Sequence, residues 1–296
     1  MDHATVIDGK AISKRIKEET QALVGQLAKQ DVRVSLDAIM VGAPPGGEIY
    51  ARSQRKRCAE VGIEYRLHTL NESCDNKDVR DTIRLLNEDP SVTGIILNLP
   101  FPSHIDTPAM KYYIDPYKDV EGVNTANIGL LFYDSPIIAP CTAIAVMEIL
   151  DELNYQVRGM NAVVVGQGDI AGKPVSLFLL HKMATVTSCH IATRDLAMHT
   201  RNADLVVAAV GKPNLIRSEH VKPGAVVIDV GINTVQNEKG EKTIVGDVAF
   251  DEVGEVAGAV TPVPGGVGPI TVAILLRSAA QAASKQLATP RRLSDV

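Results

Sequence analysis

The chain has 296 residues, of which 45% are hydrophobic and 22% are charged, and its net charge is −5. This is an ordinary globular composition, long enough for one large domain or two smaller ones. The acidic balance disfavours a surface for nucleic acid or anionic lipid, because either would require an excess of Lys and Arg. The four cysteines are widely spaced and match no metal-ligand pattern, so we expect neither a metal site nor a disulfide framework.

The N-terminal segment MDHATVIDGK contains no apolar signal region. We also expect no stretch of the chain to reach the length of a membrane span. Together with the absence of a disulfide pattern, these features predict a protein of the reducing cytoplasm.

The first half of the chain alternates between helical and strand-like patterns. Apolar residues at helical spacing predict helices, and continuous or alternating apolar runs predict strands. In chain order we expect a helix at 12–27, a strand at 32–42, a helix at 49–63, a strand at 63–70, a helix at 76–90 with Asn76 as its N-cap, and a strand at 94–102.

A polar segment at 115–129 carries turn signals at Gly122, Asn124, Asn127 and Gly129. A second alternating series then begins near Pro140. Its expected elements are a helix at 143–153, strands at 161–166, 184–190, 203–211 and 224–231, and a long apolar helix at 268–287 that packs back onto the first half. This order predicts an α/β fold with mainly parallel sheets.

The segment NAVVVGQGDIAGKPVSLFLL combines a strand, a glycine-rich turn and a helix. Gly166, Gly168 and Gly172 would let backbone N–H groups and a helix N-terminus approach a pyrophosphate closely. The spacing is one residue longer than the usual dinucleotide fingerprint. A nucleotide site and a plain tight turn both fit this segment, and the strands that follow favour the nucleotide.

The segment TPVPGGVGPIT, residues 261–271, holds prolines and glycines directly before the last helix. Such a rigid segment suits a close approach of the backbone to a ligand. A linker between domains would have the same composition.

These segments together resemble the bifunctional methylenetetrahydrofolate dehydrogenase/methenyltetrahydrofolate cyclohydrolase (FolD) family along nearly the whole chain. The matching motifs include IDGK, GIILNLPFP, PYKDVEG, PCT, AVGKP, VIDVGIN, VGDV and TPVPGGVGP. The resemblance implies two domains with a cleft between them. It implies an N-terminal α/β folate-binding domain from residues 1–139 plus 269–296, and a Rossmann-like domain for NAD(P) from residues 140–268.

The resemblance also implies the cofactor site. Its expected residues are Gly166, Gln167, Gly168, Asp169, Ile170, Gly172, Ile191, Arg194, Val210, Gly211, Gly231, Ile232, Gly268 and Thr271. NADP is the family's usual cofactor. This chain has Gln167 and Ile191 where NADP-dependent relatives often carry a cation or serine, so the residues leave NAD open.

For the substrate, the resemblance implies that the aminobenzoyl ring of a tetrahydrofolate derivative packs on a tyrosine. The expected substrate residues are Tyr50, Leu99, Pro100, Glu121, Pro264, Gly265 and Gly266, and the expected catalytic residues are Tyr50, Gln54, Asn98 and Glu121. Three of these depart from the family pattern. Gln54 stands at the family's catalytic lysine, Asn98 at a glutamine, and Glu121 at the aspartate that holds the pterin.

These departures predict a change in activity. Hydride transfer needs positioning but no proton movement, whereas opening the methenyl ring with water needs proton transfers. An amide cannot act as a general base or acid at neutral pH. Arg55 stays protonated and Lys56 points to another side of the helix, so neither is an easy substitute. We therefore predict a dehydrogenase with impaired or absent cyclohydrolase activity.

Three alternatives remain at this point. The chain is a full bifunctional enzyme if water is activated through Tyr50 or an ordered network. Otherwise it is an oxidoreductase for a non-folate cyclic amine or imine, or a catalytically inactive binding or regulatory protein. The retained glycine motifs argue against the last of these. The resemblance further implies a homodimer, which nothing else in the sequence indicates.

Overall fold

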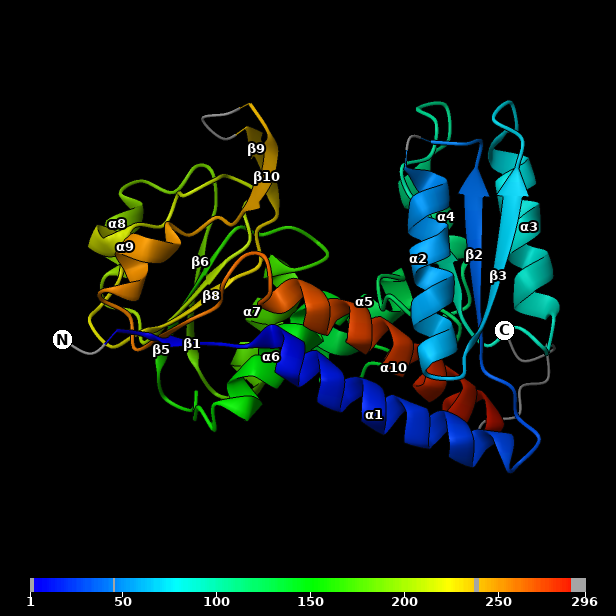
Figure 1. Cartoon of the computed structure of the whole chain (residues 1–296), viewed down its shortest axis with the longest axis horizontal. Helices are drawn as coiled ribbons and strands as arrows, with labels where there is room; N and C mark the ends of the chain where they lie inside the picture. The colour runs from blue at the N-terminus through cyan, green and yellow to red at the C-terminus, as the bar shows by residue number, and fades with distance from the viewer. Residues whose placement is uncertain (1–2, 45, 237–239, 289–296) are drawn as a thin grey trace. The chain divides into compact units, whose positions relative to one another are not determined.

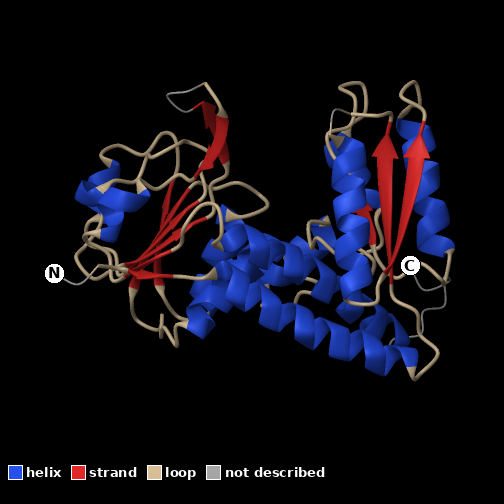
Figure 2. Ribbon diagram, in the orientation of Figure 1, coloured by secondary structure: helices blue, strands red, loops and turns tan. Residues whose placement is uncertain are grey.

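The computed structural model describes residues 3–44, 46–236 and 240–288. It confirms an α/β protein with parallel sheets (Figures 1 and 2). The chain folds into two compact units. We call residues 15–139 with 275–296 the first unit, and residues 1–14 with 140–274 the second unit.

The first unit contains a three-stranded parallel sheet of order β3-β2-β4. Figure 1 shows α2 on one face of this sheet and α3 on the other. Every residue of the central strand is buried, as the continuous apolar pattern predicted. The bounds are β2 Ser35–Val41, α2 Gly47–Glu60, β3 Glu64–Leu70, α3 Asn76–Glu88, β4 Ile95–Leu97, α4 Thr107–Tyr113 and α5 Thr125–Phe132.

Two details of the first unit correct the sequence analysis. The N-cap of α3 is Asp75 and not Asn76, because the Asp75 carboxylate accepts from the Asp78 N–H in a reciprocal capping box. Asn127 and Gly129 lie inside α5 and not in a turn. The side chain of Asn124 caps that helix, which explains why a segment rich in turn residues becomes helical.

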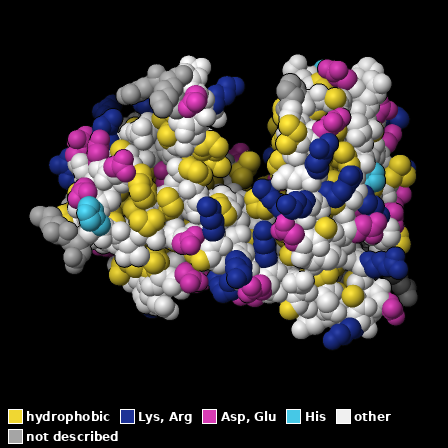
Figure 3. Space-filling view, in the orientation of Figure 1, with side chains coloured by type: hydrophobic (Ala, Val, Ile, Leu, Met, Phe, Trp, Pro, Cys, Tyr) yellow, Lys and Arg dark blue, Asp and Glu magenta, His cyan; other side chains and the backbone are white. Residues whose placement is uncertain are grey.

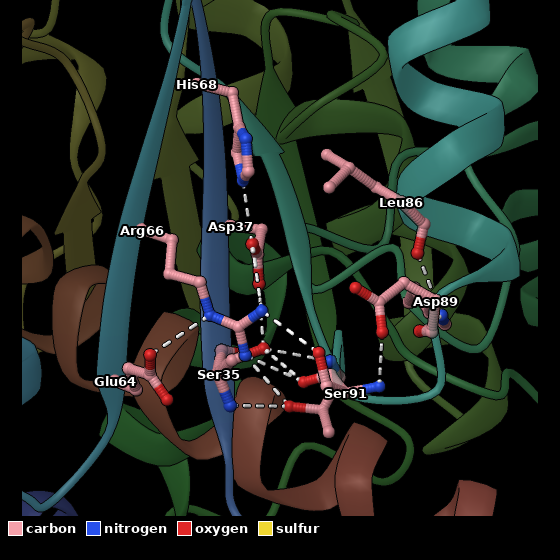
Figure 4. A network of polar contacts seen from close by, with 10 residues as sticks. Ser35, Asp37, Glu64, Arg66, His68, Leu86, Asp89 and Ser91 are labelled. Atoms are coloured by element: carbon pink, nitrogen blue, oxygen red, sulfur yellow. Dashed lines mark hydrogen bonds and ion pairs between the residues drawn. The ribbon is translucent and has the colours of Figure 1, made fainter.

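A buried carboxylate connects β2 and β3 (Figure 4). Asp37 Oδ1 lies 2.8 Å from His68 Nε2, and Asp37 Oδ2 accepts from Ser35 Oγ at 2.7 Å. Arg66 donates to the Ser91 carbonyl at 2.9 Å. Since side chains alternate along a strand, this network fixes one face of β3 and leaves Tyr65 on the other face, toward α2.

The second unit contains a six-stranded parallel sheet of order β1-β11-β8-β7-β5-β6. The core strands are almost entirely hydrophobic because helices cover both faces. The strand bounds are β1 Thr5–Val6, β5 Asn161–Val165, β6 Thr185–Cys189, β7 Leu205–Ala208, β8 Val226–Asp229, β9 Asn233–Gln236, β10 Lys242–Val245 and β11 Ala259–Val260, with β9 and β10 forming a separate antiparallel pair. The helices are α6 Cys141–Glu152, α7 Gly172–His181, α8 Leu196–Thr200, α9 Phe250–Gly254 and the short 3-10 turn Ser218–His220.

The two units differ from the expected domain limits at both ends of the chain. Residues 1–14 fall with the second unit because Thr5 and Val6 form β1, which pairs with β11. We did not predict this two-residue strand, which is too short to show a periodic pattern. Residues 269–274 also fall with the second unit.

Two long helices contribute to both units, α1 Gly9–Ala28 and α10 Val267–Ala288. By length and composition α10 could cross a membrane, contrary to our expectation that no stretch would be long enough. However, 56% of its apolar window is buried within the protein. Leu276, Ala279 and Ala283 pack with Leu36 in the core of the first unit, so α10 has the environment of a core helix.

Candidate active site

Helix α2 forms one wall of the candidate site in the first unit. Its buried positions are Ala51, Gln54 and Cys58, at the spacing of one helix face. The neighbouring cations Arg55 and Lys56 are exposed, and Figure 3 shows Lys and Arg side chains gathered over this helix. The basic cluster is therefore a solvated face, as its composition indicated, while the neutral Gln54 points inward.

A chain of three neutral, hydrogen-bonded side chains crosses the candidate site. The hydroxyl of Tyr65 donates to Gln54 Oε1 at 3.1 Å, and Asn98 Nδ2 donates to the same hydroxyl at 3.2 Å. All three residues are buried. The three elements α2, β3 and the end of β4 meet here, so the fold brings the predicted Gln54 and Asn98 together through a tyrosine that sequence analysis missed.

Each amide also keeps one buried polar atom without a partner within the described residues. These atoms are Gln54 Nε2 and Asn98 Oδ1. Nearly all buried polar groups in native proteins are paired with protein or water. Unpaired atoms at adjacent positions are therefore a sign of a site that is completed by a ligand or water.

Glu121 and Tyr50 add two titratable groups to the candidate site. Burial is the main cause that raises the pKa of Glu121, to about 7, with Asp119 adding to the rise and Lys111 opposing it. Burial and the nearby Glu121 also raise the pKa of Tyr50. Tyr50 is about half exposed, with a side chain available to pack on a ligand. The predicted Leu99 and Pro100 directly follow Asn98 and are exposed.

In the second unit, the predicted cofactor residues gather at one edge of the sheet. Gly166 follows β5, Ile191 lies two residues after β6, Val210 lies two after β7, and Gly231 lies two after β8. The carboxyl ends of parallel strands share one edge. Strand β5 pairs with both β6 and β7, so the strand order reverses there, and this is where doubly wound sheets bind ligands.

The glycines of the turn after β5 are required by the path of the backbone. Gly166 has φ +99°, and a Cβ there would lie 2.1 Å from the Ala209 carbonyl oxygen. A Cβ on Gly172 would lie 1.8 Å from the Gly166 carbonyl oxygen. A Cβ on Gly168 would meet nothing within 4 Å. The turn is therefore tightly closed on the protein side and open around Gly168, which fits a cradle for a pyrophosphate.

The side chains at this edge of the sheet contribute less to the candidate cofactor site than the backbone of the glycine turn does. Gln167 Nε2 donates back to the Val164 carbonyl at 3.1 Å, and Asp169 pairs with Lys173 at 2.6 Å. Ile170, Ile191 and Arg194 are exposed. Arg194 is the only cation among the residues predicted to contact the cofactor.

A buried carboxylate that sequence analysis did not single out holds the neighbouring loop. Asp247 accepts from the N–H groups of Val210, Gly211 and Lys212 at 2.6–3.0 Å, and from Asn233 Nδ2 at 2.9 Å. The only signal in the sequence was its place in the VGDV motif. Asp247 therefore fixes the position of two predicted cofactor residues, Val210 and Gly211.

The proline- and glycine-rich segment lines a cavity of about 270 Å³ within the second unit. The predicted residues that line this cavity are Gly231, Ile232, Pro264, Gly265, Gly266 and Gly268. Thr271 does not line it, and its hydroxyl donates to the Val267 carbonyl at 3.2 Å. A larger cavity of about 740 Å³ in the first unit, bordered by Tyr112, Tyr117 and Gln286, includes none of the predicted site residues.

The chain matches two protein-family models. Residues 7–121 match the tetrahydrofolate dehydrogenase/cyclohydrolase catalytic domain, and residues 140–287 match the NAD(P)-binding domain of the same family. Among curated proteins, it is 45% identical over 282 residues to the bifunctional protein FolD of Nitratiruptor sp., covering 95% of this chain and 98% of that protein.

Solved structures agree with this match. The bifunctional FolD enzyme of Campylobacter jejuni superposes with a TM-score of 0.90 at 40% identity, covering 96% of this chain and 99% of that one. The Trypanosoma brucei FolD, solved with NADP and an inhibitor, has a TM-score of 0.90 at 38% identity, covering 98% and 100%. These matches confirm the resemblance found in the sequence, and the chain belongs to the tetrahydrofolate dehydrogenase/cyclohydrolase family.

Proposed function

We propose that the protein oxidises 5,10-methylenetetrahydrofolate to 5,10-methenyltetrahydrofolate in one-carbon metabolism, and that its cyclohydrolase activity is impaired or lost. The nicotinamide cofactor takes up the hydride. We propose NADP, supported by the NAD(P)-binding domain and by the Trypanosoma brucei relative solved with NADP. NAD stays open because Gln167 and Ile191 offer no charge to a 2′-phosphate.

The observation that carries the proposal is the neutral environment of residue 54. Gln54 is buried, and its side-chain oxygen accepts a hydrogen bond from the neutral phenol of Tyr65. Burial raises the pKa of Tyr65, so its hydroxyl is no base at neutral pH. Hydride transfer requires only that substrate and cofactor be held in place, whereas losing general acid–base catalysis costs on the order of 10²–10⁴ in rate.

Each residue predicted to contact the folate has a role in this scheme. The Tyr50 ring packs on the aminobenzoyl group, and Leu99 and Pro100 line the folate path. Glu121 binds the pterin edge. Gln54 and Asn98 hydrogen-bond the folate near the carbon that gives up the hydride. Pro264, Gly265 and Gly266 approach the substrate through their backbone.

A second candidate is the full bifunctional enzyme. Glu121 favours it, because a carboxyl group with a pKa of about 7 is well suited to move protons at neutral pH. The curated relatives carry the name bifunctional protein FolD. In this alternative Glu121 takes over the proton transfers that Gln54 cannot perform.

The deciding experiment follows two reactions in the purified protein. Reduced cofactor is measured with methylenetetrahydrofolate and NADP or NAD, and the decay of added methenyltetrahydrofolate is measured separately. The proposal is supported if the cofactor is reduced while methenyltetrahydrofolate decays no faster than it does in buffer. Fast decay supports the bifunctional enzyme instead. If neither reaction occurs, a folate titration separates a non-folate oxidoreductase from an inactive folate-binding protein.

We propose a homodimer, to be tested by sedimentation, and a cytoplasmic location, to be tested by fractionation. The four cysteines are all buried and form no disulfide within the described residues, which is compatible with a reducing compartment.

A further inference from the structure

Tyr65 lies between the two amide side chains of the candidate pocket. Its hydroxyl is within hydrogen-bond distance of Gln54 Oε1 and of Asn98 Nδ2, at 3.1 and 3.2 Å. The phenol is 9% exposed. Gln54 comes from α2, Tyr65 from β3 and Asn98 from the end of β4, so one hydroxyl links three separate elements.

This arrangement determines which polar atom of each amide is not hydrogen-bonded to Tyr65 and is available to a ligand. If the phenol hydrogen points to one amide oxygen, the other amide must donate its N–H to the phenol oxygen. The nitrogen and oxygen of each amide can be exchanged by a rotation of about 180°, and the two consistent arrangements are mirror versions of one another. In either arrangement, one amide nitrogen and one amide oxygen remain for a ligand. In the structure they are Gln54 Nε2 and Asn98 Oδ1.

The phenol itself is held firmly. Its ring packs in the same hydrophobic core as Ala51 and Cys58 of α2. The Arg55 guanidinium lies 5.7 Å from the ring centre. On the other face of β3, the hydrogen bonds of Arg66 and His68 fix the strand (Figure 4).

We propose that Tyr65 is a positioning residue for the folate. Its hydroxyl fixes the two amides so that they present one donor and one acceptor to a neutral polar group of the bound substrate. This inference rests on the proposed dehydrogenase function. Tyr65 takes no part in the chemistry itself, and acts through Gln54 and Asn98.

The direct test is Tyr65→Phe, which keeps the ring and removes the hydroxyl. We expect KM for methylenetetrahydrofolate to rise roughly threefold to tenfold, the range for one lost hydrogen bond. KM for the nicotinamide cofactor should not change. Tyr155→Phe is the control, because it removes the phenol hydrogen bond of a half-buried tyrosine in the second unit, which donates to the Asp204 carbonyl at 2.9 Å. It should leave both constants unchanged.

A second readout does not depend on activity. The side-chain amide signals of Gln54 and Asn98 in a ¹⁵N–¹H NMR spectrum are assigned by their absence in Gln54→Leu and Asn98→Leu. In Tyr65→Phe both signals should shift, and the Asn98 signal should also exchange faster with water because its N–H loses the phenol oxygen as acceptor. In Tyr155→Phe neither signal should change. Asn98→Asp should shift the Gln54 signal too, because a carboxylate takes the phenol hydrogen and Gln54 must then turn its nitrogen to Tyr65.

The outcomes separate this inference from the proposed function. A wild-type protein without dehydrogenase activity overturns the function, and the NMR signals with folate titration then decide whether Tyr65 orders the amides. An active wild type with unchanged KM and unchanged signals in Tyr65→Phe overturns the role of Tyr65 alone. If KM for the folate and KM for the cofactor rise equally in Tyr65→Phe, and Tm falls strongly, then Tyr65 has only a structural role. That result would also overturn the inference.

Discussion

The two candidate sites of this molecule are built from different parts of the chain. At the sheet edge of the second unit, the path of the backbone makes the site. Gly166 and Gly172 are closed against carbonyl oxygens, and Asp247 holds the next loop by its N–H groups. At the candidate site of the first unit, the side chains of Gln54, Tyr65 and Asn98 make the site. A backbone site changes only when the chain path changes, whereas a side-chain site can change its chemistry by one substitution.

The largest effect is expected from restoring a base at residue 54, which tests whether one substitution changes the chemistry of the site made by side chains. In Gln54→Lys we expect hydrolysis of methenyltetrahydrofolate to rise by about 10²–10⁴, since burial lowers a lysine pKa toward the working range. The decay of the methenyl absorbance measures it. Arg52→Lys is the control, because it adds a lysine to an exposed position of the same helix. An unchanged rate in a folded Gln54→Lys would mean that hydrolysis does not depend on this position.

The backbone site should respond most to an added methyl group. A Cβ at position 172 would meet the Gly166 carbonyl oxygen at 1.8 Å, so the turn must move. Because a displaced turn loses hydrogen bonds to the charged pyrophosphate, each of about 1.5–3 kcal/mol, we expect Gly172→Ala to weaken NADP binding by about 10–10²-fold. Fluorescence titration measures the Kd. Gly25→Ala in α1, where a Cβ meets nothing within 4 Å, is the control and should leave the Kd unchanged. Equal affinity in both variants would contradict a backbone-built cradle.

The site made by side chains should also respond to pH, because it contains the titratable Glu121. Its folded pKa of about 7 lies above the ordinary value of 4.5, so between these pH values the folded state binds more protons than the unfolded state. The free energy of unfolding should therefore fall as pH rises from about 4.5 to 7 and then level off. We expect a loss of roughly 2 kcal/mol, allowing for the partial exposure of the side chain.

Glu121→Gln should remove this pH dependence, because its side chain stays neutral. Urea unfolding of both proteins between pH 5 and 8 measures the difference. KM for the folate should rise below pH 7 in the wild type, where the carboxylate is lost, and should show no such rise in Glu121→Gln. Parallel profiles for the two proteins would refute the assignment to Glu121.

The smallest effect is expected at Gln167, a side chain of the backbone-built site. Gln167→Ala removes one hydrogen bond to the Val164 carbonyl. That bond contributes about 0.5–1.5 kcal/mol to stability, and we expect the Kd for NADP to change by no more than about threefold. Calorimetry of cofactor binding provides the measurement. A loss as large as that of Gly172→Ala would show that side chains matter equally at both sites.

The sequence predicted the fold well wherever the pattern was long. The buried strands β2, β5, β7 and β8 appeared as apolar runs, and the glycine turn after β5 was identified from its spacing. Short elements escaped prediction. The two-residue strands β1 and β11 carry no periodicity, and α5 was hidden because its capping Asn124 resembled a turn signal.

The candidate site was predictable only in part, for a physical reason. Gln54 and Asn98 were found because they occupy known motif positions. Tyr65 belongs to no motif, and its alternation along β3 shows only that it faces inward. Its contact with both amides joins residues 11 and 33 positions apart. No local pattern encodes a contact that three separate elements create when they pack.

Helix α2 also carries Cys58, one turn after Gln54, with a fully buried thiol. Burial raises the pKa of this thiol to about 12, so it resists alkylation while the helix stays packed. Its reaction with a thiol reagent requires α2 to separate from the sheet. The rate of that reaction therefore measures how often α2 opens. The native chain carries this probe already, so no label has to be introduced.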